Sequence, residues 1–104
     1  MRTLLGALLA LGLMGSAAGG PQVSHTVTIE NMQFNPPDLT VHRGDRVVWI
    51  NNDLFPHTAT AERKSFDSGS IAADASWSYV AAKSGEYPYG CTFHPTMKGK
   101  LTVQ

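Results

Sequence analysis

Three side chains that bind soft metal ions stand at regular steps near the end of the chain. Cys91, His94 and Met97 follow one another at intervals of three residues in the run CTFHPTM. A tight loop with this spacing directs all three side chains toward one point. A second histidine, His57, lies 34 residues before Cys91 at the expected start of a strand, from which it could reach the same point.

This donor set favours copper among the metals. Soft sulfur suits Cu(I), imidazole suits either oxidation state, and a methionine thioether serves as a weak axial ligand. Structural zinc sites instead use several Cys or His and rarely contain Met. Taken singly, a cysteine or a methionine is more often a buried packing residue than a ligand. Their combination in one short loop is what favours a copper site.

Composition and charge narrow the classes of protein. The chain has 104 residues, with 8 Lys and Arg balanced by 8 Asp and Glu, and a single Cys. This length predicts one small domain. A chain without charge excess or basic runs lacks the electrostatic footprint of a nucleic-acid binder. The single cysteine excludes an intramolecular disulfide, so a special role for Cys91 must be that of a thiolate.

Residues 1–18 have the pattern of an export signal. Arg2 precedes a short apolar run, and the small residues Ser16, Ala17 and Ala18 then offer a cleavage site. The segment from Leu4 to Ala18 is shorter than the roughly 20 residues that a membrane-spanning helix needs. We therefore expect a signal peptide at 1–18, a mature domain at 19–104 without stable membrane insertion, and a periplasmic or otherwise exported location. Retention of the leader as an anchor stays open.

The remaining chain alternates polar and apolar residues with a period of two, which is typical of strands. Alternating runs occupy residues 25–30 and 39–42, the run 46–51 is apolar on both faces, and further strand-like runs occupy 57–62, 76–81, 86–91 and 100–103. Seven or eight short strands in so few residues predict an all-β fold, an antiparallel Greek-key β-sandwich. Five large side chains in these contexts are expected in the core: Met32, Phe34, Trp49, Trp77 and Tyr89.

Nearly all of the expected mature chain resembles the cupredoxins, or type 1 blue copper proteins, and within them the amicyanin and plastocyanin group. The resemblance rests on the segments MQFNPPDLTVHRGDRVVWINND, PHTAT, FDSG and GEYPYGCTFHPTMKGKLTV. The two-residue gaps between Cys, His and Met are similar to the short amicyanin loop. The resemblance implies that His57, Cys91 and His94 are trigonal ligands of one type 1 copper ion and that Met97 is its axial ligand.

The resemblance also implies a function. A cupredoxin carries one electron between redox partner proteins while its copper cycles between Cu(II) and Cu(I), and it transforms no substrate. In the family the histidine of the ligand loop has an edge near solvent within an apolar patch, which here would surround His94. Leu54, Phe55 and Phe93 flank the two ligand segments, so we expect partners to dock there on a monomeric protein.

Two positions depart from the family pattern. Many members follow the first ligand with Asn, whose side chain ties the two ligand segments together, whereas this chain has Thr58. The shorter hydroxyl predicts a weaker or water-mediated tie. The amicyanin loop has Pro where this chain has Phe93, which restores a backbone N–H near the Cys91 sulfur and is expected to raise the reduction potential.

Three other classes compete with an electron carrier. A copper carrier or chaperone could use the same ligands but would exchange its metal readily. A copper enzyme such as a nitrite reductase needs further histidine clusters, and only His25 and His42 remain, unpaired in the sequence. A Cys–His hydrolase needs a carboxylate that orients the histidine, and none is evident beside Cys91 and His94.

Overall fold

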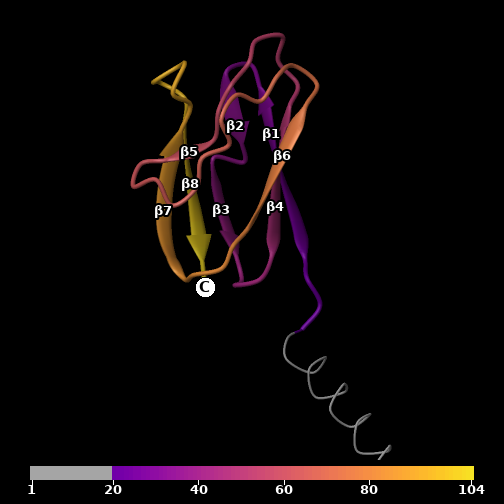
Figure 1. The fold of residues 1–104 in the computed structure, drawn as a ribbon, viewed down its shortest axis with the longest axis vertical. Helices are drawn as coiled ribbons and strands as arrows, with labels where there is room; N and C mark the ends of the chain where they lie inside the picture. Colours follow the sequence, from indigo (N-terminus) through magenta and orange to yellow (C-terminus); the bar gives the residue numbers. More distant parts are fainter. Residues whose placement is uncertain (1–19) are drawn as a thin grey trace, which may run out of the picture.

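Residues 20–104 form two four-stranded sheets that pack face to face in the computed structural model, which describes only these residues (Figure 1). The strands are β1 (Ser24–Glu30), β2 (Gln33–Asn35), β3 (Asp38–Val41), β4 (Arg46–Asn51), β5 (Thr60–Ala61), β6 (Ser76–Val80), β7 (Gly85–Gly90) and β8 (Lys98–Val103). One sheet has the order β2-β1-β4-β6 and the other β3-β8-β7-β5. The expected signal peptide lies outside the described residues, which contain no helix suited to spanning a membrane.

The predicted β-sandwich is confirmed, with one refinement of its pairing. Most neighbouring strands are antiparallel, but β1 pairs with β4 and β3 pairs with β8 in parallel. After β1 and β2 the chain crosses to the other sheet as β3 and then returns beside β1 as β4. Having passed through β2 and β3, the chain runs in β4 in the same direction as in β1. Each sheet is therefore mixed.

The core follows from the alternation along the strands. On β4, Val47, Trp49 and Asn51 are buried, whereas the residues between them face outward and are partly exposed. Trp49 lies at the centre, with its ring centroid 5.5 Å from that of Tyr89 in a T-shaped arrangement. Such edge-to-face packing adds stabilisation beyond the buried area. The inward-facing residues of the other strands fill the rest of the space between the two sheets.

Four of the five expected core residues are placed as predicted. Phe34, Trp49 and Tyr89 are buried, and the partly buried Trp77 packs against the core. The expectation for Met32 is wrong, because this side chain is exposed. Met32 and its neighbour Asn31 have φ values of 60° and 55°, which place them in a left-handed turn between β1 and β2 rather than in a strand.

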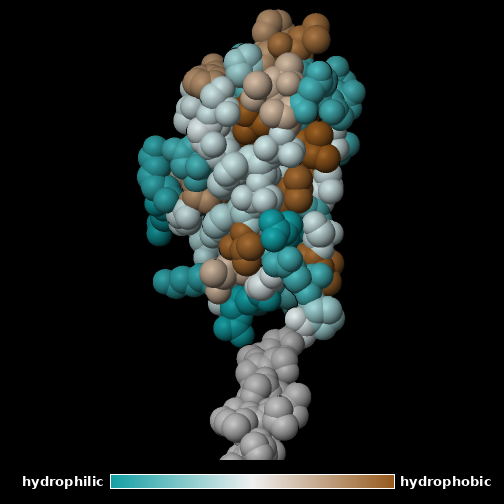
Figure 2. Space-filling model, turned by 45° about the vertical axis from the view of Figure 1, so that its right-hand side comes forward, coloured by the Kyte–Doolittle hydropathy of each residue, from teal (hydrophilic) through white to brown (hydrophobic). Residues whose placement is uncertain are grey.

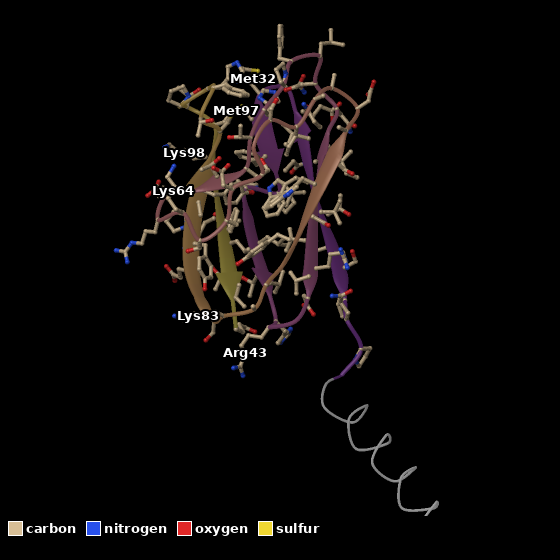
Figure 3. The ribbon with its side chains drawn as sticks, viewed as in Figure 1. Met32, Arg43, Lys64, Lys83, Met97 and Lys98 are labelled. Carbon is tan, nitrogen blue, oxygen red and sulfur yellow. The ribbon has the colours of Figure 1, made fainter. Side chains whose placement is uncertain are left out.

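One end of the sandwich gathers the segments that carry the candidate ligands. The connection after β4, the β1–β2 turn and the connection between β7 and β8 all lie at the upper end in Figure 1. Figure 3 shows Met32 and Met97 at this end and Arg43 at the opposite one. The buried amide of Asn51 donates hydrogen bonds to the carbonyl oxygens of Phe55 (2.8 Å) and Ile71 (2.9 Å). These bonds fix the path of the chain between β4 and His57.

A carboxylate fastens the opposite end. Asp45 accepts hydrogen bonds from the amides of His42 (3.0 Å) and Val23 (3.4 Å), and its Oδ2 lies 2.9 Å from Nε2 of His25. The His42 amide, followed by the His25 side chain, lowers the pKa of Asp45 below its ordinary value of 3.8. A lowered pKa means that the folded state binds protons less readily than the unfolded chain.

We therefore expect Asp45→Asn to be less stable than the natural protein at pH 7. The native carboxylate stabilises the fold fully above pH 3.8, its ordinary pKa, and loses this contribution as the pH falls through the lower folded pKa. The difference in the free energy of unfolding should therefore shrink on acidification. Urea unfolding of both proteins along a pH series measures it, and a difference that is the same in acid as at neutral pH would contradict the expectation.

Candidate metal centre

His57, Cys91 and His94 meet at the upper end of the sandwich. Cys91 Sγ lies 3.8 Å from His57 Nδ1 and 3.7 Å from His94 Nδ1. The three atoms all lie within 4.8 Å of one another. His57 is completely buried, Cys91 is buried, and His94 is partly exposed. Three donors from two distant segments thus surround one small space that water reaches from the His94 side.

The ligand loop closes on itself through its backbone. The Cys91 amide donates to the Met97 carbonyl (3.3 Å), and the Met97 amide donates to the His94 carbonyl (2.9 Å). Met97 itself is buried at the same end (Figure 3). A Cβ on Gly90 would stand only 2.7 Å from the Met97 carbonyl oxygen. Glycine therefore precedes Cys91 because the two sides of the loop approach each other so closely.

The other segment presents His57 with its ring already oriented. His57 exchanges backbone hydrogen bonds with Ile71, with N to O distances of 3.1 and 2.7 Å. Its Nε2 lies 2.8 Å from Oδ2 of Asp53. An ionised carboxylate only accepts hydrogen bonds, so the Nε2 atom carries the proton and Nδ1 keeps its lone pair for a metal. Carboxylates commonly orient metal-binding histidines in this way.

Asp53 is itself held in place by the β1–β2 turn. The amides of Asn31 (2.7 Å) and Met32 (2.9 Å) donate to its two carboxylate oxygens. Burial opposes ionisation of Asp53, but the Met32 amide, the His57 ring and the Asn31 amide together lower its pKa below the ordinary value. Sequence reasoning assigned no role to Asp53. The one available signal was its position four residues before His57.

The sulfur of Cys91 accepts a hydrogen bond from a different amide than the one expected. The donor is the backbone N–H of Thr58, 3.3 Å from Sγ. Within residues 20–104, Phe93 makes no such bond, and its side chain is largely exposed. The expected Phe93 donor is therefore wrong, and the amide that reaches the sulfur is that of Thr58, on the other ligand segment.

The tie between the two ligand segments is direct. The Thr92 amide donates to Thr58 Oγ1 at 2.9 Å, and the two hydroxyl oxygens lie 3.3 Å apart. The expectation of a water-mediated tie is thus corrected, because the contact is direct. Thr58 follows His57 and Thr92 follows Cys91, so the side chain beside one donor holds the backbone beside the other. The short Thr58 hydroxyl can reach the Thr92 amide because the two ligand segments already lie against each other, as the bond from the Thr58 amide to the Cys91 sulfur shows.

The chemistry of the donors fits copper. Two imidazole nitrogens and a thiolate in a trigonal arrangement, with a methionine in the same loop, are the donors of a blue-copper electron-transfer site. Zinc would be poorly matched, because its sites complete a tetrahedron with further Cys or His. The fold and these donors together define a β-sandwich of the type 1 copper class.

Comparison with known proteins agrees with this class. A family model described as the cupredoxin-like domain matches residues 2–103, and the chain belongs to this family. The chain is 30% identical over 103 residues to amicyanin-alpha of Methylorubrum extorquens, covering 94% of this chain and 87% of that protein. It is 27% identical over 124 residues to plastocyanin of a Synechococcus strain, covering 99% of this chain and 91% of that protein.

Solved structures show the same likeness. The crystal structure of amicyanin from Paracoccus versutus superposes with a TM-score of 0.70 at 31% sequence identity, covering 85% of this chain and 88% of that one. A copper-containing nitrite reductase from Thermus scotoductus superposes with a TM-score of 0.74 at 25% identity. That match covers 83% of this chain but only 23% of the reductase chain, so the likeness concerns one part of the larger protein.

The contact between Asp53 and His57 generates a prediction. Asp53→Ala removes the acceptor that keeps the proton on Nε2, so the buried ring of His57 loses its fixed tautomer and orientation. Losing such a partner typically lowers metal affinity about 10- to 100-fold. Competition with a chelator of known affinity measures this for copper, and the ¹⁵N shifts of the ring report the tautomer in the metal-free protein. Asp38→Ala, which removes an exposed carboxylate from β3, is the matched control and should bind copper like the natural protein.

Proposed function

We propose that this protein is a soluble one-electron carrier that cycles a type 1 copper between Cu(II) and Cu(I) for redox partner proteins. His57, Cys91 and His94 would hold the ion in a trigonal arrangement, with Met97 as the weak axial ligand. The observation that carries the proposal is the convergence of two Nδ1 atoms and one sulfur within 4.8 Å at one end of a β-sandwich. This donor set matches electron-transfer copper rather than a structural metal.

The protein's contribution is a site that changes little between the two oxidation states. When bound, copper supplies the one-electron couple. Asp53 holds His57 by its Nε2–H, and the backbone bonds between Cys91 and Met97 hold the loop closed. The Thr58 amide donates to the sulfur, which favours the more electron-rich thiolate of the reduced form. Burial of Cys91 limits access of water and oxidants to this thiolate.

Electron exchange is proposed to take place at the exposed face of His94. Leu54, Phe55 and Phe93 have exposed fractions of 88%, 59% and 51%, so these apolar side chains do not fold back into the core. Figure 2 shows hydrophobic side chains gathered at the upper end of the molecule. Exposed apolar patches of this kind mark interaction sites. A redox partner that covered them would approach the copper through the histidine nearest to solvent.

We further propose export of the chain, with residues 1–18 as a removable signal peptide and 19–104 as the copper domain in the periplasm or outside the cell. The pattern of one positive charge, an apolar run and small residues supports this.

We also propose that the protein transfers electrons without acting as an enzyme. The amicyanin and plastocyanin relatives support this, and among the described residues His57, Cys91 and His94 form the one cluster of three potential metal ligands.

The visible spectrum of the copper-loaded protein tests the proposed function. We expect an intense blue band from charge transfer between the Cys91 thiolate and Cu(II). Cys91→Ser should abolish the band, because a hydroxyl cannot replace the thiolate. His42→Gln, which changes an exposed histidine outside the cluster, is the matched control and should keep it. A colourless Cu(II) protein would contradict the proposal.

The midpoint potential tests whether Met97 is the axial ligand. Copper retention distinguishes an electron carrier from a copper chaperone. Met97→Leu should keep a coloured site and raise the midpoint potential, because the weak axial donor favours Cu(II). The natural protein should also retain its copper against a chelator over many redox cycles. A copper chaperone would release its metal readily under the same conditions. An unchanged potential in Met97→Leu would show that Met97 is not a ligand.

A further inference from the structure

A chain of side chains leads from the ligand loop to the surface of the sandwich. Thr58 Oγ1, which accepts the Thr92 amide, lies 2.9 Å from Thr60 Oγ1. Thr60 Oγ1 in turn lies 3.0 Å from Oδ1 of Asp67. Thr58 and Thr60 are buried, whereas Asp67 is exposed. Two hydroxyls therefore connect an exposed carboxylate with the backbone next to Cys91.

We propose that Thr60 and Asp67 are positioning residues, which orient the Thr58 hydroxyl so that it accepts the Thr92 amide. Each hydroxyl has one proton to donate, and an ionised carboxylate only accepts. Thr60 Oγ1 is placed as the donor to both Thr58 Oγ1 and Asp67 Oδ1, so its single proton lies between two acceptors and Thr58 Oγ1 is an acceptor in this contact. The contact with Thr60 thus holds the Thr58 side chain in the position where its Oγ1 also accepts the Thr92 N–H.

Thr58, Thr60 and Asp67 form a hydrogen-bonded relay, and the Asp67 carboxylate at its end is itself held in place. The Gly69 amide donates to the same Oδ1 of Asp67 at 3.0 Å, and Asp67 forms a β-bridge with Thr60. The Ser68 hydroxyl accepts the Ala59 amide at 2.8 Å, which fastens the same two segments a second time. The Gly69 amide and the Thr60 hydroxyl lower the pKa of Asp67, so it is ionised at neutral pH.

The relay acts on a residue that contacts the Cys91 sulfur directly and also holds the backbone next to Cys91. Thr58 donates its own amide to Cys91 Sγ, and Thr92 is the residue that follows Cys91. A Thr58 side chain that rotated away would release the Thr92 backbone and loosen the sulfur contact with it. The consequence for copper rests on the proposed function, whereas the orientation of the hydroxyl is a property of the protein without metal.

Amide hydrogen exchange of Thr92 in the metal-free protein tests the relay directly. Thr58→Val removes the acceptor, and we expect exchange of this amide to quicken roughly two- to tenfold, the range that one net hydrogen bond accounts for. Thr60→Val and Asp67→Ala should produce a part of the same increase although neither side chain forms a hydrogen bond with Thr92. Thr60→Ser and Asp67→Asn retain a hydroxyl and an acceptor oxygen, and they should restore slow exchange.

Thr102→Val serves as the matched control, because it changes a partly buried threonine of β8 outside the relay and should leave the Thr92 amide unchanged. Normal exchange of Thr92 in Thr60→Val would overturn the proposal, since Thr58 would then act alone. Faster exchange spread equally over β5 and β7 would also overturn it, because that indicates general loosening.

In the copper-loaded protein, removal of copper by a chelator should quicken in Thr60→Val and return to normal in Thr60→Ser. An unchanged removal rate in Thr60→Val would refute the consequence for the metal. If the natural protein lacks the blue band, the proposed function fails, but the exchange of the Thr92 amide without metal still decides whether the relay exists.

Discussion

The site depends on the contact between two segments that are 34 residues apart, one with His57 and Thr58 and the other beginning at Cys91. A trigonal site needs donors from both, and each segment alone is a short loop with no rigidity of its own. Thr58 joins them twice, by its amide to the Cys91 sulfur and by its hydroxyl to the Thr92 amide. The entropy of assembling the site is thus lost during folding rather than when the metal binds.

The mixed pairing of the strands explains how the segment before His57 meets the β1–β2 turn. Because β4 returns beside β1 in parallel, the connection after β4 emerges at the same end as the β1–β2 turn. This places Asp53 where the amides of Asn31 and Met32 can hold it. The carboxylate that orients His57 is therefore fixed by the turn that follows the neighbouring strand β1. An exposed left-handed Met32 is part of that arrangement rather than a fault in packing.

Much of this architecture could be predicted from local patterns. Alternation with a period of two identifies strands, and the three-residue steps from Cys91 to Met97 identify a ligand loop, because both are properties of contiguous sequence. The partners of those residues are not. Asp53, and Thr58 as the donor to sulfur, depend on how one loop lies against another, which no short window encodes. The Phe93 expectation failed for this reason, since the donor to the sulfur comes from a segment 33 residues away in the chain.

The two histidines are unequal in a way that suits electron transfer. His57 is completely buried and its Nε2 is engaged by Asp53, so its position is determined by the protein on every side. His94 is partly exposed, and among the described residues its ring has one hydrogen-bond contact, that of Nδ1 with the Cys91 sulfur. One proposed ligand is thus anchored in the sandwich, and the other is partly open to solvent at the same end. A carrier needs both, because the anchored ligand keeps the geometry constant while the exposed one shortens the distance to a partner.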